Sequence, residues 1–159
     1  MKQIVTHANP DLDAIVSAWL AQDFLFRGQP TEVVFVSRKV PEKVRQTADC
    51  LVDVGNTYCP ARYRFDHKPP AFANRNSTCA TRLIWEHLRE IGVQVEHLAP
   101  LVQVTYEGDT HRNSAALKQS RIDGPHAELA RLKRQYRKAT DVYQRMVVWL
   151  RQHARQLRR

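Results

Sequence analysis

Short apolar runs of strand length recur along the first half of the chain. They lie at 2–7 (KQIVTH), 31–37 (TEVVFVS) and 50–55 (CLVDVG), and a shorter candidate follows at 62–67 (RYRFDH). β-Branched residues are frequent in these runs and Gly or Pro lies close to several of their ends, which is typical of strands. The run at 31–37 is nearly continuous in its apolar character, so we expect it to be buried on both faces of a sheet.

Helical periodicity separates these predicted strands. Apolar residues fall on one side of the segment that starts at Asp11, and Gly28 ends the pattern, which predicts a helix between the first two strands. A short helix is expected at 41–46. Strands that alternate with helices predict an α/β fold, with a mainly parallel sheet flanked by helices and joined by right-handed crossovers.

A further helix is predicted from Ser77 through Ile91. Ser77 can cap the N-terminus of this helix, and Gly92 lies just beyond its end. The following stretch, 92–124, has the weakest pattern of the chain. There we expect one or two short helices and an active-site loop.

The C-terminal segment has the most regular pattern. From Leu129 to Leu157 apolar residues alternate by three and four, which predicts a long C-terminal helix of about thirty residues, opened by Gly124-Pro125. We therefore divide the chain into a domain at 1–124 and a helix at 125–159. The apolar stripe of this helix either packs on its own domain or forms a seam with a second copy in a homo-oligomer.

Positive charge is concentrated in the same segment. The chain has a net charge of +9, and residues 125–159 hold ten Lys or Arg against two acids, so only one net positive charge remains for 1–124. Such a basic segment favours polyanions such as nucleic acid, or it is the solvated face of a helix.

The rest of the composition indicates a reducing compartment. No apolar run approaches the ~18 residues that a membrane span needs, and the N-terminus lacks the apolar core of a signal peptide. The cysteines are odd in number and form no CxxC pair. We expect a cytoplasmic protein with no membrane partner. Its cysteines are interpreted as small buried or neutral residues: Cys50, Cys59 and Cys79.

One imidazole and two carboxylates follow the first predicted strand. His7, Asp11 and Asp13 form an H-x-x-x-D-x-D string between this strand and the next helix. Ligands of an open α/β sheet bind beyond the carboxyl ends of its strands, so this turn can direct all three side chains toward one point. Each also has a structural explanation by itself, since Asp11 can cap the helix and Asp13 can interact with its dipole.

Acidic residues recur at the ends of the later strands. Asp53 lies at the end of a buried strand, and Asp66-His67 ends the next candidate. Burying carboxylates without partners is costly, and a pair of divalent cations would relieve their mutual repulsion. Mixed carboxylate and imidazole ligands suit two Mn²⁺ ions, with Mg²⁺, Co²⁺ or Zn²⁺ as alternatives.

These strings resemble the motifs of the DHH phosphoesterase superfamily, which includes RecJ-type exonucleases, short-oligonucleotide RNases and family II pyrophosphatases. THANPDLDAIVSAWLA is similar to the first motif, CLVDVG to the second, RFDHK to the third, which is normally Asp-His-His, and GDTHRN to the fourth. VDVGNTY followed by RYRFDH is most similar to the metal-dependent RNA-exonuclease branch. The resemblance covers residues 1 to about 115.

The resemblance implies two-metal hydrolysis, in which cations activate a water molecule and neutralise phosphate oxygens without a protein nucleophile. Asp66 would orient His67, and Asp53, His67 and Lys68 would be the catalytic residues. The metal ligands that it implies are His7 and Asp11 for one ion, Asp13, His67 and Asp109 for the other, and Asp53 as the bridge between them.

The sequence departs from the family pattern at two points, the third motif and the segment after Gly124. Lys68 replaces the second His of the third motif; lysine can bind the substrate phosphate as a point charge but cannot serve as a neutral-pH acid. Glu107 competes with Asp109 as the fourth-motif ligand. No Gly-rich substrate-binding domain follows Gly124. We expect the basic helix to replace that domain in part, near the cleft or by pairing subunits, through Arg131, Lys133, Arg134, Arg137 and Lys138.

Three functions compete on these grounds. The first is a manganese-dependent phosphodiesterase that acts on a nucleotide or short oligonucleotide, with Tyr58, Tyr63 or Phe72 as candidates for base stacking. The second is a catalytically silent metal- and nucleotide-binding module, which Lys68 and the missing second domain favour. The third is a nucleic-acid-binding protein that relies on its basic tail, but this leaves the acidic residues unexplained. The sequence favours the first.

Overall fold

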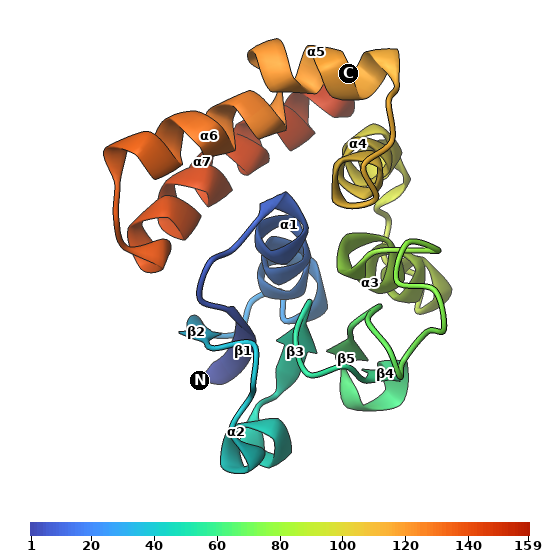
Figure 1. The fold of residues 1–159 in the computed structure, drawn as a ribbon, viewed down its shortest axis with the longest axis vertical. Coiled ribbons are helices and arrows are strands. Elements are labelled where there is room, and N and C mark those ends of the chain that lie inside the picture. Colours follow the sequence, from blue (N-terminus) through green and yellow to red (C-terminus); the bar gives the residue numbers. More distant parts are fainter.

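The computed structural model describes residues 1–159 and has an α/β fold (Figure 1). Its strands are β1 (Lys2–His7), β2 (Thr31–Val36), β3 (Cys50–Val52), β4 (Tyr58–Cys59) and β5 (Arg64–Phe65). Its helices are α1 (Leu12–Leu20), α2 (Glu42–Thr47), α3 (Ala80–Glu90), α4 (Ala99–Asp109), α5 (Ala115–Asp123), α6 (Pro125–Gln135) and α7 (Ala139–Leu157). A π-helical turn (Ala21–Leu25) extends α1, and 3₁₀ turns lie at Pro60–Arg62 and Glu96–Leu98. None of the helices combines the length and apolar character of a membrane span.

The five strands form one sheet in the order β2-β1-β3-β5-β4 (Figure 1). β1 pairs in parallel with β2 along its whole length, from Lys2 opposite Thr31 to His7 opposite Val36. β3 is parallel to both β1 and β5, and only β4 runs antiparallel, against β5. The mainly parallel sheet expected from the alternation of strands and helices is confirmed.

Side chains of the central strands alternate between two packing layers. Ile4 and Cys50 contribute to the larger core, whose other residues come mainly from α1, α3, α4, α6 and α7. Val5 and Leu51 face the opposite layer, against which Val44 of α2 packs. Every residue of α1 is buried because this helix lies between the sheet and the α6–α7 pair (Figure 1).

The expectation that residues 31–37 are buried on both faces is wrong. β2 is the edge strand next to β1, and its side chains are half-buried or exposed. Its apolar residues still pack on both layers, Val33 and Phe35 on one and Val34 and Val36 on the other. The apolar pattern is therefore explained by packing on both faces of β2. The position of β2 at the edge of the sheet leaves its side chains partly accessible to solvent.

α3 begins later than predicted, and Ser77 does not cap it. Cys79 precedes its first residue and makes no capping hydrogen bond through its side chain. The carboxylate of Asp13 takes this role instead, accepting the N–H of Ala80 at 3.0 Å and that of Thr81 at 2.8 Å. A buried acid from another helix thus replaces the local cap and interacts with the positive end of the α3 dipole.

The weakly patterned stretch 92–124 contains two helices, α4 and α5, as well as a 3₁₀ turn. The expectation of one or two short helices there is confirmed. α4 packs against α1 and α3, and its last residue is Asp109. The end of α4 therefore brings this acid toward the start of α1.

The C-terminal segment forms two helices, so the prediction of one helix of about thirty residues is wrong. α6 ends at Gln135, and the backbone is extended at Tyr136 and again at Lys138, where the chain turns back on itself (Figure 1). α7, with 19 residues, is the long C-terminal helix. A continuous helix over this segment would be roughly 50 Å long. Folding back lets both halves of the apolar stripe reach the same core.

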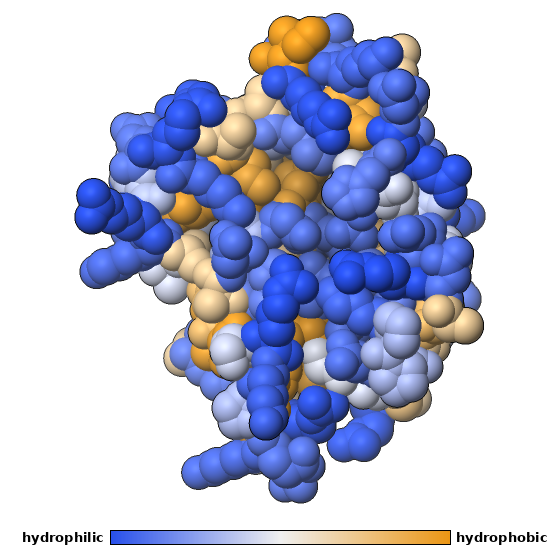
Figure 2. All heavy atoms as spheres, in the orientation of Figure 1, coloured by the Kyte–Doolittle hydropathy of each residue, from blue (hydrophilic) through white to orange (hydrophobic).

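The apolar stripe of this segment packs on its own domain. Leu129 and Leu132 of α6 join Met146 and Leu150 of α7 in the main core. Residues 1–124 and 125–159 therefore share one hydrophobic core. Hydrophilic residues cover most of the face in Figure 2, and hydrophobic ones show only in separate areas. Among the large apolar side chains of α7, Val148 is the exposed one.

Candidate metal centre

Three strand ends place candidate residues at one edge of the sheet. His7 is the last residue of β1, Asp53 directly follows β3, and Asp66 and His67 directly follow β5. These strands are parallel, so their carboxyl ends lie together. Asp53 has a left-handed backbone with φ +54°, a conformation that Asp and Asn tolerate better than most residues. This turn directs the chain out of β3 at the edge where the acids gather.

The first group consists of His7, Asp11 and Asp53, whose nearest ligand atoms all lie within 4.8 Å of one another. Nε2 of His7 is 3.0 Å from Oδ2 of Asp53 and 3.9 Å from Oδ1 of Asp11. His7 and Asp53 are buried, whereas the Asp11 side chain is 51% exposed. Asp11 also caps α1, since its Oδ1 accepts the N–H of Ala14 at 2.9 Å. The capping explanation for Asp11 therefore holds, and it leaves the second oxygen available.

The second group consists of Asp13, Asp53 and His67, and Asp109 adjoins it. Nε2 of His67 lies 3.4 Å from Oδ1 of Asp53, 3.7 Å from Oδ2 of Asp13 and 3.4 Å from Oδ2 of Asp109. Asp53 belongs to both groups. The structure thus places the six residues assigned to metal binding around two adjacent points that share one carboxylate.

Two buried atoms, one in the second group and one in the adjoining Asp109, have no hydrogen-bond partner. They are Nε2 of His67 and Oδ2 of Asp109. Nδ1 of the same imidazole lies 2.6 Å from the carbonyl oxygen of Arg75, which fixes the ring so that Nε2 faces the carboxylates. Buried polar atoms without partners are rare in folded proteins. An unpartnered imidazole nitrogen beside carboxylate oxygens is a donor set that fits a divalent cation.

Burial and mutual repulsion shift the pKa values of the ionisable groups in this cluster. Burial, together with the charges of Asp53 and Asp109, raises the pKa of Asp13 well above its usual value. Burial and Asp53 raise the pKa of Asp109 to about 6. Burial would lower the pKa of His67, but the carboxylates of Asp53 and Asp13 outweigh it and raise this pKa to about 9. Without a metal ion, the cluster therefore holds protons that a cation would displace.

Lys68 contacts the shared carboxylate directly. Its Nζ lies 2.5 Å from Oδ1 of Asp53 and 3.0 Å from Oδ1 of Asp66, and it also donates to the Asp53 carbonyl oxygen at 3.0 Å. Burial would raise the pKa of Asp53, but the adjacent imidazoles of His67 and His7 and the charge of Lys68 hold it far below the usual range. The ammonium group is thus a fixed cation inside the cluster.

Asp66 orients the main chain around His67 and does not touch its ring. This fully buried carboxylate accepts the N–H of Asn56 at 2.7 Å and the N–H of His67 at 2.8 Å. The Arg75 carbonyl, which the motif gave no reason to single out, is the group that orients the imidazole.

Of the two acids at the end of α4, Asp109 lies at the cluster and Glu107 does not. The Glu107 carboxylate accepts hydrogen bonds from Ser114 and Gln103, at 2.5 and 3.1 Å. On a helix, residues two positions apart face different directions, so only one of these acids can point toward His67. The structure places Asp109 there.

A cleft of about 270 Å³ opens beside the cluster, between the start of α1 and the end of α4. Arg75, His111 and His126 line it together with Asp11, Asp13 and Asp109. Sequence reasoning missed these three. His111, inside the GDTHRN string, carried the only signal that could have found one of them.

Lys133 is the basic residue of α6 that reaches this region. Its Nζ lies 3.4 Å from Oδ1 of Asn9, in the loop between β1 and α1. Arg131 instead forms an ion pair with Glu128 on its own helix. The expectation that the basic segment lies near the cleft therefore applies to Lys133.

The fold and the site together define an α/β domain with two buried His/Asp groups, at the carboxyl edge of its sheet, that could hold metal ions. The chain matches no known family model, and neither a curated protein nor a solved structure shows detectable similarity to it.

Metal affinity should rise with pH. His67 must lose a proton to bind a cation through Nε2, and its pKa of about 9 means that it is protonated at neutral pH. Below this pKa, loss of the His67 proton should by itself strengthen binding at the second group by up to about tenfold for each pH unit. Calorimetric titration with Mn²⁺ at pH 6, 7 and 8, in two buffers of different ionisation enthalpy, counts the protons released. An affinity that does not change with pH would contradict the assignment of His67, and His67→Gln should flatten the dependence.

Gly108→Ala should disturb the wall of the cleft. A methyl group at Gly108 would overlap the imidazole of His126, whose Nδ1 lies 2.7 Å from Oγ of Ser120. We expect a loss of about 1–3 kcal/mol in the free energy of unfolding, since α6 must shift away from α4. Urea denaturation measures it. Removing the ring in Gly108→Ala/His126→Ala should make the two changes non-additive, whereas additive losses would show that the ring is not the obstacle.

Proposed function

We propose that this protein is a divalent-metal-dependent phosphoesterase of the DHH type, which hydrolyses a phosphate bond in a nucleotide or short oligonucleotide. The observation that carries the proposal is the pair of His/Asp groups that share Asp53 beside an open cleft. The order of the motif strings along the chain supports it, because each string supplies residues to this one edge of the sheet.

Two Mn²⁺ ions held by these groups would polarise a phosphate group and activate a water molecule for attack. Contacts within the protein hold two residues of the cluster in position. Asp13 is anchored on the N-terminus of α3, and His67 is oriented by the Arg75 carbonyl. Such fixed positions are what a hydrolytic centre needs, because its ligands must not rearrange during the reaction.

Cationic side chains beside the cluster suit a phosphate-containing substrate. Arg75 lines the cleft and Lys133 reaches over the loop that precedes α1. A guanidinium group can bind two phosphate oxygens at once, while an ammonium group acts as a point charge. Lys68, whose side chain is 17% exposed, adds a positive charge next to Asp53. These charges would bind the substrate and offset its negative charge.

The cysteines do not offer a protein nucleophile. Burial raises the pKa of the Cys50 thiol and of the Cys79 thiol, so both stay protonated and unreactive. Cys59 lies on β4, outside the cleft. Attack by water, which the two-metal mechanism uses, is consistent with this arrangement.

Two aromatic residues remain candidates for contact with a base. Tyr58 is 41% exposed and its ring centroid lies 5.3 Å from that of Phe72. Tyr63 instead packs edge-on against Phe26 and His87, which assigns it to the core.

A catalytically silent metal- and nucleotide-binding module is the second candidate. The contact of Lys68 with Asp53 favours it, because an ammonium group already neutralises the carboxylate that the two groups share. Lysine also cannot protonate a leaving group at neutral pH as imidazole can.

A cleavage assay separates the two functions. Metal-free protein would be incubated with short RNA and DNA oligonucleotides, a cyclic dinucleotide and pyrophosphate, with and without Mn²⁺, and Asp53→Asn would serve as the control. Cleavage of one substrate that requires Mn²⁺ and is absent from Asp53→Asn is the expected result. Two bound Mn²⁺ ions without cleavage of any substrate would favour the silent module. A protein that binds no Mn²⁺ would refute both.

A further inference from the structure

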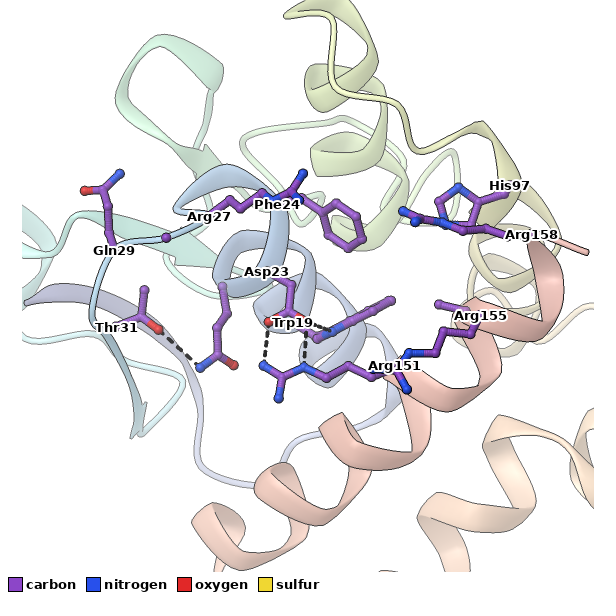
Figure 3. A pocket seen from close by; sticks show the side chains of 13 residues that line it. Trp19, Asp23, Phe24, Arg27, Gln29, Thr31, His97, Arg151, Arg155 and Arg158 are labelled. Carbon is purple, nitrogen blue, oxygen red and sulfur yellow. Dashed lines mark hydrogen bonds and ion pairs between the residues drawn. The ribbon is translucent and has the colours of Figure 1, made fainter.

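A second, basic pocket lies at the far end of α1. The cavity, of about 570 Å³, is formed by the π-helical turn after α1, the loop that leads to β2, and the last turns of α7 (Figure 3). The metal centre adjoins the first turn of α1, and ten residues of helix separate Asp13 from Asp23, so the two sites lie roughly 15 Å apart along the helix axis. This pocket shares no residue with the metal centre.

Four arginines surround this cavity, and only one carboxylate offsets them. The arginines are Arg27, Arg151, Arg155 and Arg158. The acid is Asp23, and both of its oxygens are already engaged. Arg151 binds it in a bidentate ion pair at 2.7 and 2.8 Å, and Nε1 of Trp19 donates to it at 2.8 Å (Figure 3).

Three guanidinium groups therefore have no acidic partner. Arg27 and Arg155 form no hydrogen bond or ion pair through their side chains, and Nε of Arg158 donates to Nε2 of His97 at 3.1 Å. Burial and the charge of Arg158 lower the pKa of His97, so the ring accepts this bond in its neutral form. The arginines at the C-terminus of α7 interact favourably with the dipole of that helix. Arg27 comes from a different element, so this effect does not explain why it lies at the same cavity.

Apolar surface lines the same cavity. The ring of Phe24 lies between Arg27 and the pair formed by His97 and Arg158 (Figure 3). It meets Trp19 edge-on, with 5.5 Å between the ring centroids. The pocket thus combines positive charge with an aromatic wall.

We propose that this pocket binds a small polyphosphate anion of nucleotide size, either a nucleoside triphosphate or inorganic triphosphate. Guanidinium groups match phosphate oxygens in geometry and remain charged at any relevant pH. The volume lies in the range of pockets for small ligands. A triphosphate carries enough negative charge to neutralise Arg27, Arg155 and Arg158 together.

The test is a calorimetric titration of metal-free protein with inorganic tripolyphosphate and with ATP. Without divalent cations the proposed metal-dependent hydrolysis cannot proceed, so this titration tests the basic pocket independently of the proposed function. Arg155→Glu/Arg158→Glu should weaken binding of both ligands roughly 10- to 100-fold. Lys43→Glu/Arg62→Glu, which makes the same charge change on exposed residues of α2 and of the 3₁₀ turn at Pro60–Arg62, should have little effect.

Two further measurements identify the ligand and check that the variants are folded. If ATP binds more tightly than tripolyphosphate, and Phe24→Leu removes the difference, the ligand is a nucleotide; equal binding indicates the inorganic anion. Thermal melts must show that each variant is folded. Equal weakening by the two charge-reversal variants would show a diffuse charge effect and overturn the proposal, as would a wild-type protein that binds neither anion.

Discussion

Asp53→Asn should remove both bound ions together. Asp53 is the only residue present in both His/Asp groups, and its two oxygens face different partners, Oδ2 toward His7 and Oδ1 toward His67 and Lys68. An amide offers one oxygen and no negative charge. Disturbing a neighbour of a metal ligand already weakens binding roughly 10- to 100-fold, so loss of a shared ligand should cost at least that for each ion. Phosphate-bond cleavage should fall to background.

The substitution is conservative for the backbone, because Asn tolerates the left-handed conformation found at Asp53. Asp11→Asn is the matched comparison: it belongs to the first group alone and its side chain is half exposed. Calorimetry or elemental analysis should find two ions in the wild type, one in Asp11→Asn and none in Asp53→Asn. Asp49→Asn, far from the cleft and paired with Lys2, should keep both. Two ions in Asp53→Asn would refute the shared-ligand arrangement.

Lys68→Met should destabilise the metal-free protein and strengthen its binding of Mn²⁺. Lys68 is the only lysine or arginine whose side chain contacts the cluster, where it balances the buried acids Asp53 and Asp66. Removing one member of a buried ion pair leaves the other uncompensated, at a cost of about 3–5 kcal/mol. The same change removes a cation that competes for Asp53. A metal ion at about 100 times its Kd would restore about 2.7 kcal/mol per site.

Thermal unfolding with and without Mn²⁺ measures both effects. The wild type should gain less from the ion than Lys68→Met does, and Lys39→Met, on the exposed loop before α2, should behave as the wild type. If Lys68→Met binds Mn²⁺ more weakly than the wild type, Lys68 supports the ion instead of competing with it. Cleavage by Lys68→Met would further show that its ammonium group is dispensable for turnover.

The position of the site could be predicted from the sequence better than the contacts between its residues. Asp53 and His67 could be placed at one edge because parallel strands end together, a rule that needs only strand positions. The capping of α3 by Asp13 was not predictable, because it joins residues 67 and 68 positions apart. Lys68 was expected to face the substrate phosphate, and its turn toward Asp53 depends on the loop geometry that Asp66 fixes.

Features that depend on packing between residues far apart in the sequence could not be predicted from local sequence patterns either. No Gly or Pro marks the break at Tyr136 in the sequence. The helix ends there because the following segment folds back to pack on the same core. The basic pocket combines arginines from the turn after α1 and from α7, and Asp23 and Arg151 are 128 positions apart. A charge count locates positive residues along the chain, but it does not show which of them meet.

The carboxylate of Asp13 links ion binding to the local opening of the chain. It holds the first two N–H groups of α3 and also belongs to the second His/Asp group. Fraying of the α3 N-terminus therefore releases a ligand, and loss of the ion loosens the start of the helix. Local openings of this kind occur below the free energy of global unfolding. The N-terminus of α3 and the metal centre should consequently open and close as one cooperative unit. The occupancy of the metal site would then set how often this side of the core is exposed to water.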